Sequence, residues 1–426
     1  MPSPDPPPAL PGLPPALLET LREAAGGDRL ALVGGAVRDW LRHQVHNDPW
    51  RGVPDLDLVV ETGGGAEAAM EAAPAAHRLA RALRASLGAA QLPGYQEHAA
   101  YGTVELELRW GDQPLLLDVA SARRESYPVP GENPVVRFGR LEDDLARRDF
   151  TINAMALELG SDGGALVDPH GGQADLQRRL LRFLHAASVR DDPTRVVRGA
   201  RYAARLGFAL APDSQAQVRQ TVAAWPWAWR PGDPPSAAPP ALGTRLRMEC
   251  ELLLEREAWP QALAALQGWG GLALLDGALQ ADRHWRRRLH WATRLGVPRL
   301  PALLAGAPDP LALAERLQLP HRQHRLLARF LELRRRLAGS TPPLGSVAPW
   351  CTWLEGPGSS ADAVALALAS GLGPRRPLLR WWLRWRHLGS GRSAAALMAE
   401  EGLVAGPALG ERLRQLRAER LARERA

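Results

Sequence analysis

Short apolar runs alternate with helical patterns in the first part of the chain, up to about residue 160. Apolar runs bounded by turn residues are typical of strands, and apolar residues spaced three and four apart are typical of helices. Strand patterns lie at residues 30–35, 55–61, 103–110 and 114–121, and helical patterns lie at residues 15–25 and 66–88. The last two strand patterns flank Gly111 and Asp112, which predicts a hairpin. These patterns together predict a domain in which helices pack on a sheet.

Helical patterns dominate the chain after this first domain. Residues 122–140 are polar and contain Pro and Gly, so we predict a loop there, whereas residues 141–159 have a helix-like pattern. Residues 166–184 end in an amphipathic helix or a strand, and residues 191–208 form a strong helical pattern that ends at Gly207. The chain is therefore predicted to change from mixed to helical structure.

A stretch rich in Trp and Pro interrupts the helical patterns and predicts an insertion or linker. Beyond it the chain is rich in Leu, Arg and Trp, without a detectable repeat. We therefore divide the chain into a Pro-rich tail with a first helix (residues 1–28), a head (29–160), a neck (161–224), a linker (225–243) and a helical body and tail (244–426).

Composition adds a basic charge to this picture. The chain has 426 residues, a formal net charge of +7 and 53 basic residues, all of which are Arg. An anionic partner such as RNA fits this charge, and an anionic membrane surface fits it less well. Cys250 and Cys351 lie far apart and predict neither a zinc site nor a disulfide framework. Because no membrane span or signal peptide is evident, we expect a cytoplasmic protein.

Candidate chemistry lies in the first two strand patterns. Asp55 and Asp57 are two residues apart on a strand, so both carboxylates project from the same face. Carboxylates are ligands that Mg²⁺ prefers, and Asp118 on a neighbouring strand supplies a third. Taken alone, such a pair is more often surface decoration, and a Gly-Gly turn at residues 34–35 is usually only a turn. Their combination in this order predicts nucleotidyl transfer.

Several motifs in this order resemble one known family. They are LVGGAVRDWL, DLDLVV, RRDFTINAMAL, LVDPHGG and DDPTRVVRGARYAARLGF, and they cover roughly residues 30–208. They resemble the class II tRNA nucleotidyltransferase and bacterial poly(A) polymerase family, within the polymerase-β nucleotidyltransferase superfamily. The resemblance implies an α+β fold, with a catalytic head that contains a mixed sheet, followed by an all-α neck, body and tail.

The resemblance also implies roles for single residues of the head. The carboxylates Asp55, Asp57 and Asp118 would be catalytic and hold two Mg²⁺ ions. The residues expected to bind the triphosphate and ribose of the nucleotide are Gly34, Gly35, Arg38, Arg148, Asp149 and Asn153. The alternative for the last two is structural, because Asp, Thr and Asn all cap helix starts.

The segment DDPTR resembles the family motif that selects the incoming base in place of a nucleic-acid template. Asp192 and Arg195 would pair with the base, with Asp191 beside them where the family often has Glu. Being three residues apart, Asp192 and Arg195 are predicted to share a helix face. A structural alternative is a helix start with Asp at the N-cap and Pro at the first position. Further along the same pattern we expect Arg198 to bind nucleotide and, more weakly, Arg201 and Arg205 to bind RNA.

The resemblance implies addition of nucleotides from CTP and ATP to the 3′ end of tRNA. Whether CCA, only CC or only A is added stays open. A bacterial poly(A) polymerase is a further alternative, although the basic segment typical of that branch is missing from residues 87–106. A non-catalytic RNA-binding protein is a remote alternative, because it would be expected to have lost Asp55 or Asp57. We expect the Arg-rich body and tail to grip tRNA, and no obligate protein partner is evident.

Overall fold

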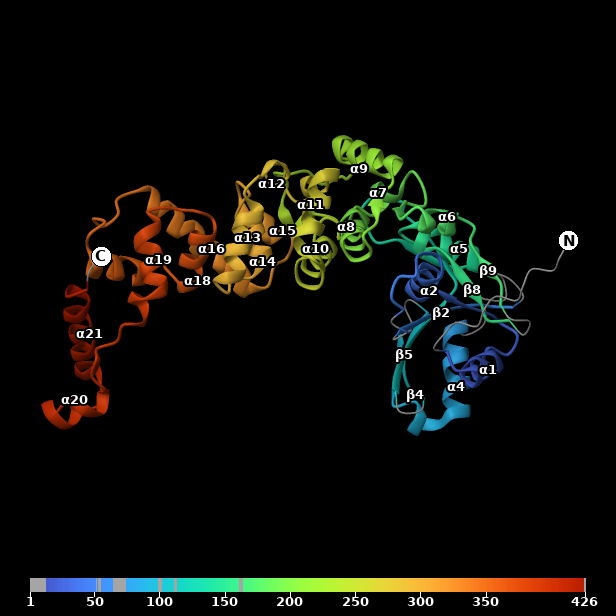
Figure 1. Cartoon of the computed structure of the whole chain (residues 1–426), viewed down its shortest axis with the longest axis horizontal. Coiled ribbons are helices and arrows are strands. Elements are labelled where there is room, and N and C mark those ends of the chain that lie inside the picture. The colour runs from blue at the N-terminus through green and yellow to red at the C-terminus, as the bar shows by residue number, and fades with distance from the viewer. Residues whose placement is uncertain are drawn as a thin grey trace. The chain divides into compact units, whose positions relative to one another are not determined.

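The computed structural model describes residues 13–50, 52, 55–63, 74–98, 102–110, 113–160 and 164–424 (Figure 1). The chain forms two compact units. Unit 1 comprises Met1–Ala228, Pro239–Ala241 and Glu257–Gly270, and unit 2 comprises Trp229–Ala238, Leu242–Arg256 and Gly271–Ala426. The stretch predicted as a linker therefore contributes to both units, and each unit is described here by itself.

Unit 1 contains a mixed seven-stranded sheet with the order β3-β4-β5-β2-β1-β8-β9. The strands are β1 (Arg29–Val33), β2 (Asp55–Glu61), β3 (Gly94–His98), β4 (Thr103–Trp110), β5 (Gln113–Ser121), β8 (Ala156–Glu158) and β9 (Leu166–Val167). β2 and β5 run parallel, whereas all the other pairs in the sheet are antiparallel. The predicted strands and the β4–β5 hairpin are confirmed. Gly111 and Asp112, predicted to turn the hairpin, lie outside the described residues.

Helices α1 (Pro15–Ala25), α2 (Gly35–His46) and α4 (Ala75–Gln91) pack around this sheet (Figure 1). The first has the predicted bounds. α4 matches the second half of the predicted helix at residues 66–88, and residues 64–73 lie outside the described part. A buried cluster of small and branched side chains fills one side of the sheet. It comprises Ala31, Val33, Val59, Ala122, Leu141, Leu145, Ala154 and Ala156.

Residues 141–159 do not form one continuous helix, so that prediction is wrong. They form α5 (Leu141–Ala146), a short 3-10 helix at Thr151–Asn153 and then β8. Phe150 between them is extended, with φ −132° and ψ 149°, and the amide of Thr151 donates to the carbonyl of Arg182 at 3.0 Å. Pairing of residues 156–158 with β1 therefore overrides their helical spacing.

The predicted loop at residues 122–140 contains regular structure. β6 (Arg123–Ser126) and β7 (Val135–Phe138) form an antiparallel two-stranded sheet, with Arg123 opposite Phe138. The amide of Gly139 donates to the carbonyl of Ala122 at 2.9 Å and closes the hairpin at its base. The polar composition of this stretch hid the two strands from the sequence pattern.

The predicted neck contains short elements and two longer helices in its described part. They are α6 (Gly172–Gln177), β10 (Leu180–Leu181), α7 (Ser188–Asp191), α8 (Thr194–Leu206), β11 (Ala209–Leu210) and α9 (Pro212–Ala224), and α11 (Trp259–Trp269), from beyond the predicted neck, completes unit 1. β10 pairs in parallel with β11. α8 ends at Gly207, whose φ of 71° is the left-handed conformation typical of a helix C-cap, as predicted. α8 packs on α11.

Unit 2 consists of helices in its described part. The main ones are α10 (Thr244–Arg256), α12 (Gly277–Ala281), α13 (Trp285–Arg294), α14 (Arg299–Leu304), α15 (Pro310–Arg316), α16 (His321–Ala338), α17 (Val347–Glu355), α18 (Ala361–Ala369), α19 (Arg375–Leu383), α20 (Ala394–Glu401) and α21 (Pro407–Ala422). Residues 363–369 of α18 are all buried, and this helix packs against α13, α16 and α19. No helix in the described ranges is both long and apolar enough to cross a membrane.

Candidate active site

Three acidic side chains from two adjacent strands gather at one end of the sheet. Asp57 lies directly opposite Asp118 in the parallel β2–β5 pairing, and Asp55 lies two residues before Asp57 on the same face. Asp57 is half-buried, and Val59, the next residue on that face of the strand, belongs to the buried cluster. The strand pairing therefore places the three predicted carboxylates on one face at the same end of the sheet.

Their charges act on one another. Burial raises the pKa of Asp57, the Arg148 guanidinium opposes that shift, and the negative charges of Asp118 and Asp55 add to it. Partial burial, together with the charges of Glu105 and Asp55, also raises the pKa of Asp118. Repulsion between like charges of this kind is relieved when a cation binds between them.

The acidic group fits a hard divalent cation by the chemistry of its donors. Carboxylate oxygens are the protein ligands that Mg²⁺ takes, usually one or two of them together with substrate phosphates and water. Among the described residues, no three side chains of Asp, Glu, His or Cys converge as a ready-made ligand set. The acidic pair of β2 with its neighbour on β5 is thus a partial ligand set.

The Gly-Gly turn lies against these carboxylates. Gly34 precedes α2 with φ 71° and ψ −131°, a conformation that side chains rarely adopt. A Cβ atom at this position would lie 3.1 Å from Nη1 of Arg148 and 3.1 Å from Oδ2 of Asp57. The backbone can approach this place only because position 34 has no side chain, as a phosphate-binding turn requires.

A Gly34→Ala variant is expected to lose about tenfold in nucleotidyl-transfer activity, because the new methyl group must displace Arg148 and Asp57 by a few tenths of an ångström. Gly26→Ala is the matched control. Gly26 also has positive φ, at 60°, but nothing lies within 4 Å of a Cβ built there. Both variants should lose about 1 kcal/mol of stability, and steady-state kinetics should separate them. Equal activity losses in the two would show that backbone strain alone is responsible.

Arg38 is buried in a hydrogen-bonded network. Its Nε and Nη2 donate to the two carboxylate oxygens of Asp39, each at 2.9 Å, and its Nη1 donates to Oδ1 of Asn153 at 2.8 Å. The guanidinium carbon lies 5.4 Å from the ring centre of Tyr202. Arg38 is therefore held rigidly one turn into α2, and its prediction as a nucleotide-binding residue stays a prediction.

The segment RRDFTIN continues this network toward α8. Nδ2 of Asn153 donates to Oδ1 of Asp149 at 2.9 Å, and Nη1 of Arg198 donates to Oδ2 of Asp149 at 3.3 Å. Burial pushes the pKa of Asp149 up, but the Arg198 charge and the Asn153 amide outweigh it, so the pKa lies below its ordinary value. Asp149 also accepts from the amide of Phe150, but the 3-10 helix at Thr151–Asn153 begins after Phe150 without a side-chain cap. The nucleotide-binding role of Asp149 and Asn153 stays a prediction.

Asp144 is a buried residue of this site that the sequence analysis missed. It accepts from Arg148 Nη2 at 3.0 Å and from Arg147 Nη2 at 2.8 Å. Burial alone would raise the pKa of Asp144. The guanidinium groups of Arg148 and Arg147 lower that pKa by more, so it lies below the ordinary value. Asp144 thus fixes the Arg148 side chain beside Asp57. The spacing of three and four residues along α5 was a signal that could have identified it.

The proposed base-selecting residues lie at the junction of α7 and α8. Asp192 is extended, with φ −140° and ψ 93°, and α8 begins only at Thr194. The prediction that Asp192 and Arg195 share a helix face is therefore wrong, because Asp192 lies outside the helix. Its Oδ1 accepts from Thr194 N at 3.1 Å and from Thr194 Oγ1 at 2.6 Å, which starts the helix.

A pocket of about 250 Å³ lies between this junction and the β6–β7 hairpin. It is lined by Arg124, Glu125, Ser126, Tyr127, Asp143, Ala146, Arg147, His185, Asp191 and Arg195. Arg195 donates through Nη2 to the carbonyl of Arg147 at 3.0 Å, whereas its buried Nη1 has no hydrogen-bond partner in the described structure. Burial raises the pKa of Asp191. The charge of His185 opposes this shift, but the pKa remains above its ordinary value. Predicted residues of the neck thus meet residues of the head here.

Arg201 and Arg205 have an intramolecular partner. Both pair with Glu257, whose side chain is almost completely buried just before α11. Arg205 also lies over the ring of Tyr202, at 5.8 Å from its centre. These contacts give the two arginines a role in joining α8 to α11, and their weak RNA-binding assignment stays a prediction.

Comparisons with known proteins found a matching family model and similar sequences. A family model described as the poly A polymerase head domain matches residues 30–182. A CC-adding tRNA nucleotidyltransferase from Deinococcus radiodurans is 40% identical over 325 residues, which is 74% of this chain and 74% of that protein. An A-adding tRNA nucleotidyltransferase from Halalkalibacterium halodurans is 42% identical over 200 residues, or 45% of this chain and 40% of that protein.

Solved structures share the fold. A CCA-adding enzyme in its apo form II has a TM-score of 0.69 at 22% identity, over 97% of this chain and 93% of that one. The Thermotoga maritima CCA-adding enzyme complexed with tRNA has a TM-score of 0.64 at 22% identity and the same coverage. The predicted α+β fold, with a mixed sheet followed by helices, is thereby confirmed.

Proposed function

Since this chain belongs to the tRNA nucleotidyltransferase family, we propose that it transfers nucleotides from CTP, ATP or both to the 3′ end of tRNA without a nucleic-acid template. The single observation that carries this proposal is the grouping of Asp57 and Asp118 on paired strands against the Gly34 turn. A carboxylate cluster beside a turn that admits phosphate is what nucleotidyl transfer needs. The family is metal-dependent, and the donor set fits that chemistry.

Asp55, Asp57 and Asp118 would hold Mg²⁺, and we propose two ions. The bound metal would neutralise the triphosphate and lower the pKa of the attacking 3′ hydroxyl. The protein's own part is positioning. The N-terminus of α2 would face the phosphates through the backbone of Gly34 and Gly35, and Arg148, held by Asp144, would add a positive charge beside Asp57.

The neck would select the base. In this proposal the Asp192 carboxylate accepts from the exocyclic amine of C or A, while Arg195 donates to a ring acceptor. The keto groups of U and G would face the carboxylate unfavourably. The Arg195 Nη1 atom without a hydrogen-bond partner in the described structure supports this role, because an incoming base would satisfy that buried donor.

Addition of CC is the specificity we favour. The relative named as CC-adding matches 74% of both chains, whereas the A-adding relative from Halalkalibacterium halodurans matches 45% of this chain. A complete CCA addition or an A-only addition is the alternative outcome. A protein with tRNA as its substrate would act in the cytoplasm.

Incubation with tRNA transcripts tests this proposal. The transcripts should end at the discriminator base, after C, after CC or after CCA, and each should be given CTP, ATP or both with Mg²⁺. We expect two cytidines to be added to the discriminator transcript with CTP, and no further extension with ATP. Extension of the CC transcript by one A would show CCA or A addition instead, and long A tails would show a poly(A) polymerase. No incorporation on any transcript would contradict the enzymatic proposal.

A further inference from the structure

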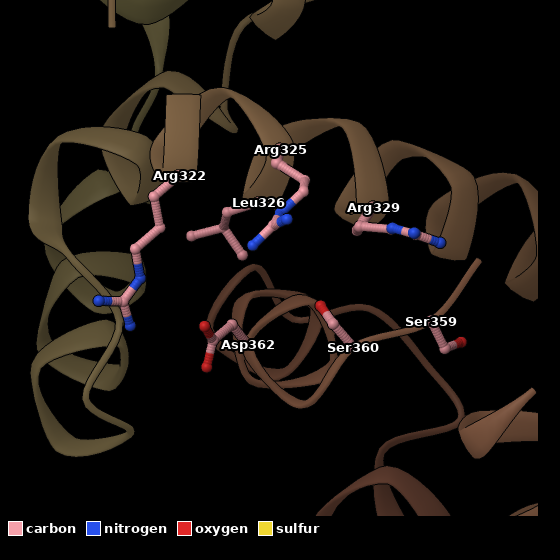
Figure 2. A pocket seen from close by; sticks show the side chains of 7 residues that line it. All are labelled: Arg322, Arg325, Leu326, Arg329, Ser359, Ser360 and Asp362. Carbon is pink, nitrogen blue, oxygen red and sulfur yellow. The ribbon is translucent and has the colours of Figure 1, made fainter. Parts of the chain in front are cut away.

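Arginine side chains occur in two different settings in this protein. In unit 2, a pocket of about 230 Å³ is lined by Arg322, Arg325 and Arg329 opposite Ser359 and Ser360 (Figure 2). These three arginines are exposed and have no ion pair or hydrogen bond within the described part of the chain, which suits the grip on tRNA that we expect of the body and tail. In unit 1, by contrast, one buried carboxylate holds two consecutive arginines in place. A fixed pair of this kind can position the groups beside it.

The carboxylate of Asp144 holds these two guanidinium groups, one on each of its oxygens. Its Oδ1 accepts from Nε and Nη2 of Arg147 at 2.9 and 2.8 Å, and its Oδ2 accepts from Nε and Nη2 of Arg148 at 3.3 and 3.0 Å. The Asp144 side chain is completely buried, whereas both arginine side chains still reach solvent. Paired, charge-assisted hydrogen bonds fix the plane of a guanidinium as well as its position. Asp144 therefore orients two neighbouring guanidinium groups at once.

Arg148 lies at the acidic group of the site. Its Nη1 is 3.1 Å from the position that a Cβ atom would take at Gly34, and its charge opposes the rise in the pKa of Asp57. This part of the site is proposed to bind the metal and the triphosphate, which are the same for every nucleotide. Displacement of Arg148 is therefore expected to slow the transfer of all nucleotides alike.

Arg147 lies at the other end of the site, where the base would be selected. Its carbonyl oxygen accepts from Nη2 of Arg195 at 3.0 Å, and both residues line the pocket beside the β6–β7 hairpin. The Arg147 side chain is held by Asp144 and, through a hydrogen bond of 3.2 Å, by Glu125. Because Arg195 is buried and donates to the main chain of Arg147, its orientation depends on where Arg147 is anchored. Displacement of Arg147 is therefore expected to change the discrimination between bases.

We propose that Asp144 is a positioning residue for both ends of the site, an inference that rests on the proposed function for the roles of those ends. Through Arg148 it places a positive charge beside the acidic group, and through Arg147 it sets the orientation of Arg195. Asp144 itself does not line the pocket around Arg195. One buried carboxylate thus makes the rate of transfer and the choice of base depend on the same anchor.

Replacement of Asp144 by Ala removes both anchors and tests this proposal. We expect Asp144→Ala to lower kcat with CTP by about 10²-fold and the preference for CTP over UTP by about tenfold. Glu142→Gln is the matched control, because Glu142 also lies on α5 and pairs with an arginine, Arg29, at 2.8 Å, but outside the pocket around Arg195. The control should keep the parent values of both quantities. A folded Asp144→Ala protein with the parent's base preference would overturn the proposal, since a merely structural carboxylate would leave that preference unchanged.

Two further variants decide the question if Asp144→Ala does not fold. Arg148→Gln should slow transfer from CTP and UTP equally and keep their ratio, because the triphosphate is common to both. Arg147→Gln should lower the preference for CTP by about tenfold and keep more of the parent kcat than Arg148→Gln does. An unchanged preference in Arg147→Gln, or a changed one in Arg148→Gln, would contradict the two separate actions of Asp144.

A double variant shows whether Asp144 acts on the base through Arg195. Asp144→Ala combined with Arg195→Gln should prefer CTP no less than Arg195→Gln alone, because the residue through which Asp144 acts has already been replaced. Losses of preference that multiply would show that Asp144 acts by another route, and would overturn the proposal.

Binding of CTP and UTP in the absence of a tRNA transcript separates this inference from the proposed function. Its readout is the ratio of the two affinities, which does not require transfer. A parent protein that prefers CTP in binding but incorporates no nucleotide would refute the proposed function. The ratio measured for Asp144→Ala and Arg147→Gln would still decide the role of Asp144, with a ratio equal to that of the parent counting against it.

Discussion

An Asp57→Ala variant is expected to lose at least about 10³-fold in nucleotidyl-transfer activity while it still binds the tRNA transcript. Asp57 is the carboxylate that connects the site, since it lies opposite Asp118 in the strand pairing and beside the Arg148 guanidinium. Its loss leaves Asp55 and Asp118 as the remaining members of the acidic group. Single-turnover incorporation with CTP and Mg²⁺ measures the effect, and binding is measured separately at several salt concentrations.

Unfolding of the variant would be a trivial cause of the activity loss. The raised pKa of Asp57 argues against that cause. A folded-state pKa raised above the unfolded value means that the protonated form stabilises the fold below the unfolded pKa, and that this stability is lost as the pH rises through the folded pKa. At neutral pH without metal, the ionised carboxylate therefore costs stability, and Asp57→Asn should melt no lower than the parent. Added Mg²⁺ should raise the melting temperature of the parent more than that of the variant.

Glu61→Gln is the matched control for this experiment. Glu61 lies on the same strand but pairs with Arg29 at 3.1 Å. Its replacement removes a carboxylate from β2 outside the site, so activity should be retained. Wild-type turnover in Asp57→Ala would reject the metal assignment, and equal losses in Glu61→Gln would show that the strand itself was disturbed.

The second large effect is expected in base choice. Arg195→Gln should lower the preference for CTP over UTP by about 10²-fold, because a charged hydrogen bond to the base is lost. Asp192→Asn should shift the preference toward UTP, since Nδ2 would present a donor to the keto group where the carboxylate presented an acceptor. Oδ1 of the new Asn can still accept from Thr194, so the start of α8 is preserved.

Competition between CTP and UTP on one transcript measures both variants. Arg190→Gln is the control, because Arg190 is exposed on α7 and does not line the pocket around Arg195. Arg195 is buried, so its variant could also be unstable, but loss of folding cannot create a preference for UTP. A preference for CTP that stays unchanged in Asp192→Asn would refute selection of the base by this residue.

Much of the head could be predicted from local patterns. Short apolar runs bounded by turn residues identified the strands that carry Asp57 and Asp118, and the cap at Gly207 identified the end of α8. These features depend on neighbouring residues in the chain, so a single sequence contains them. The helix-like spacing of residues 141–159 was misleading because the partner that makes residues 156–158 a strand, β1, lies more than 100 residues earlier.

The sequence by itself determined which chemical groups this protein carries. They are paired carboxylates on a strand, a glycine turn, and basic side chains that are all arginine apart from histidine. Only the tertiary structure decided how they meet. It placed Asp57 opposite Asp118, held Arg148 beside them through Asp144, and put Asp192 before α8 rather than on its face. It also brought Arg322, Arg325 and Arg329 against Ser359 and Ser360. The physical reason is that burial and strand pairing join residues distant in sequence, and their energies outweigh the local preferences that a sequence pattern records.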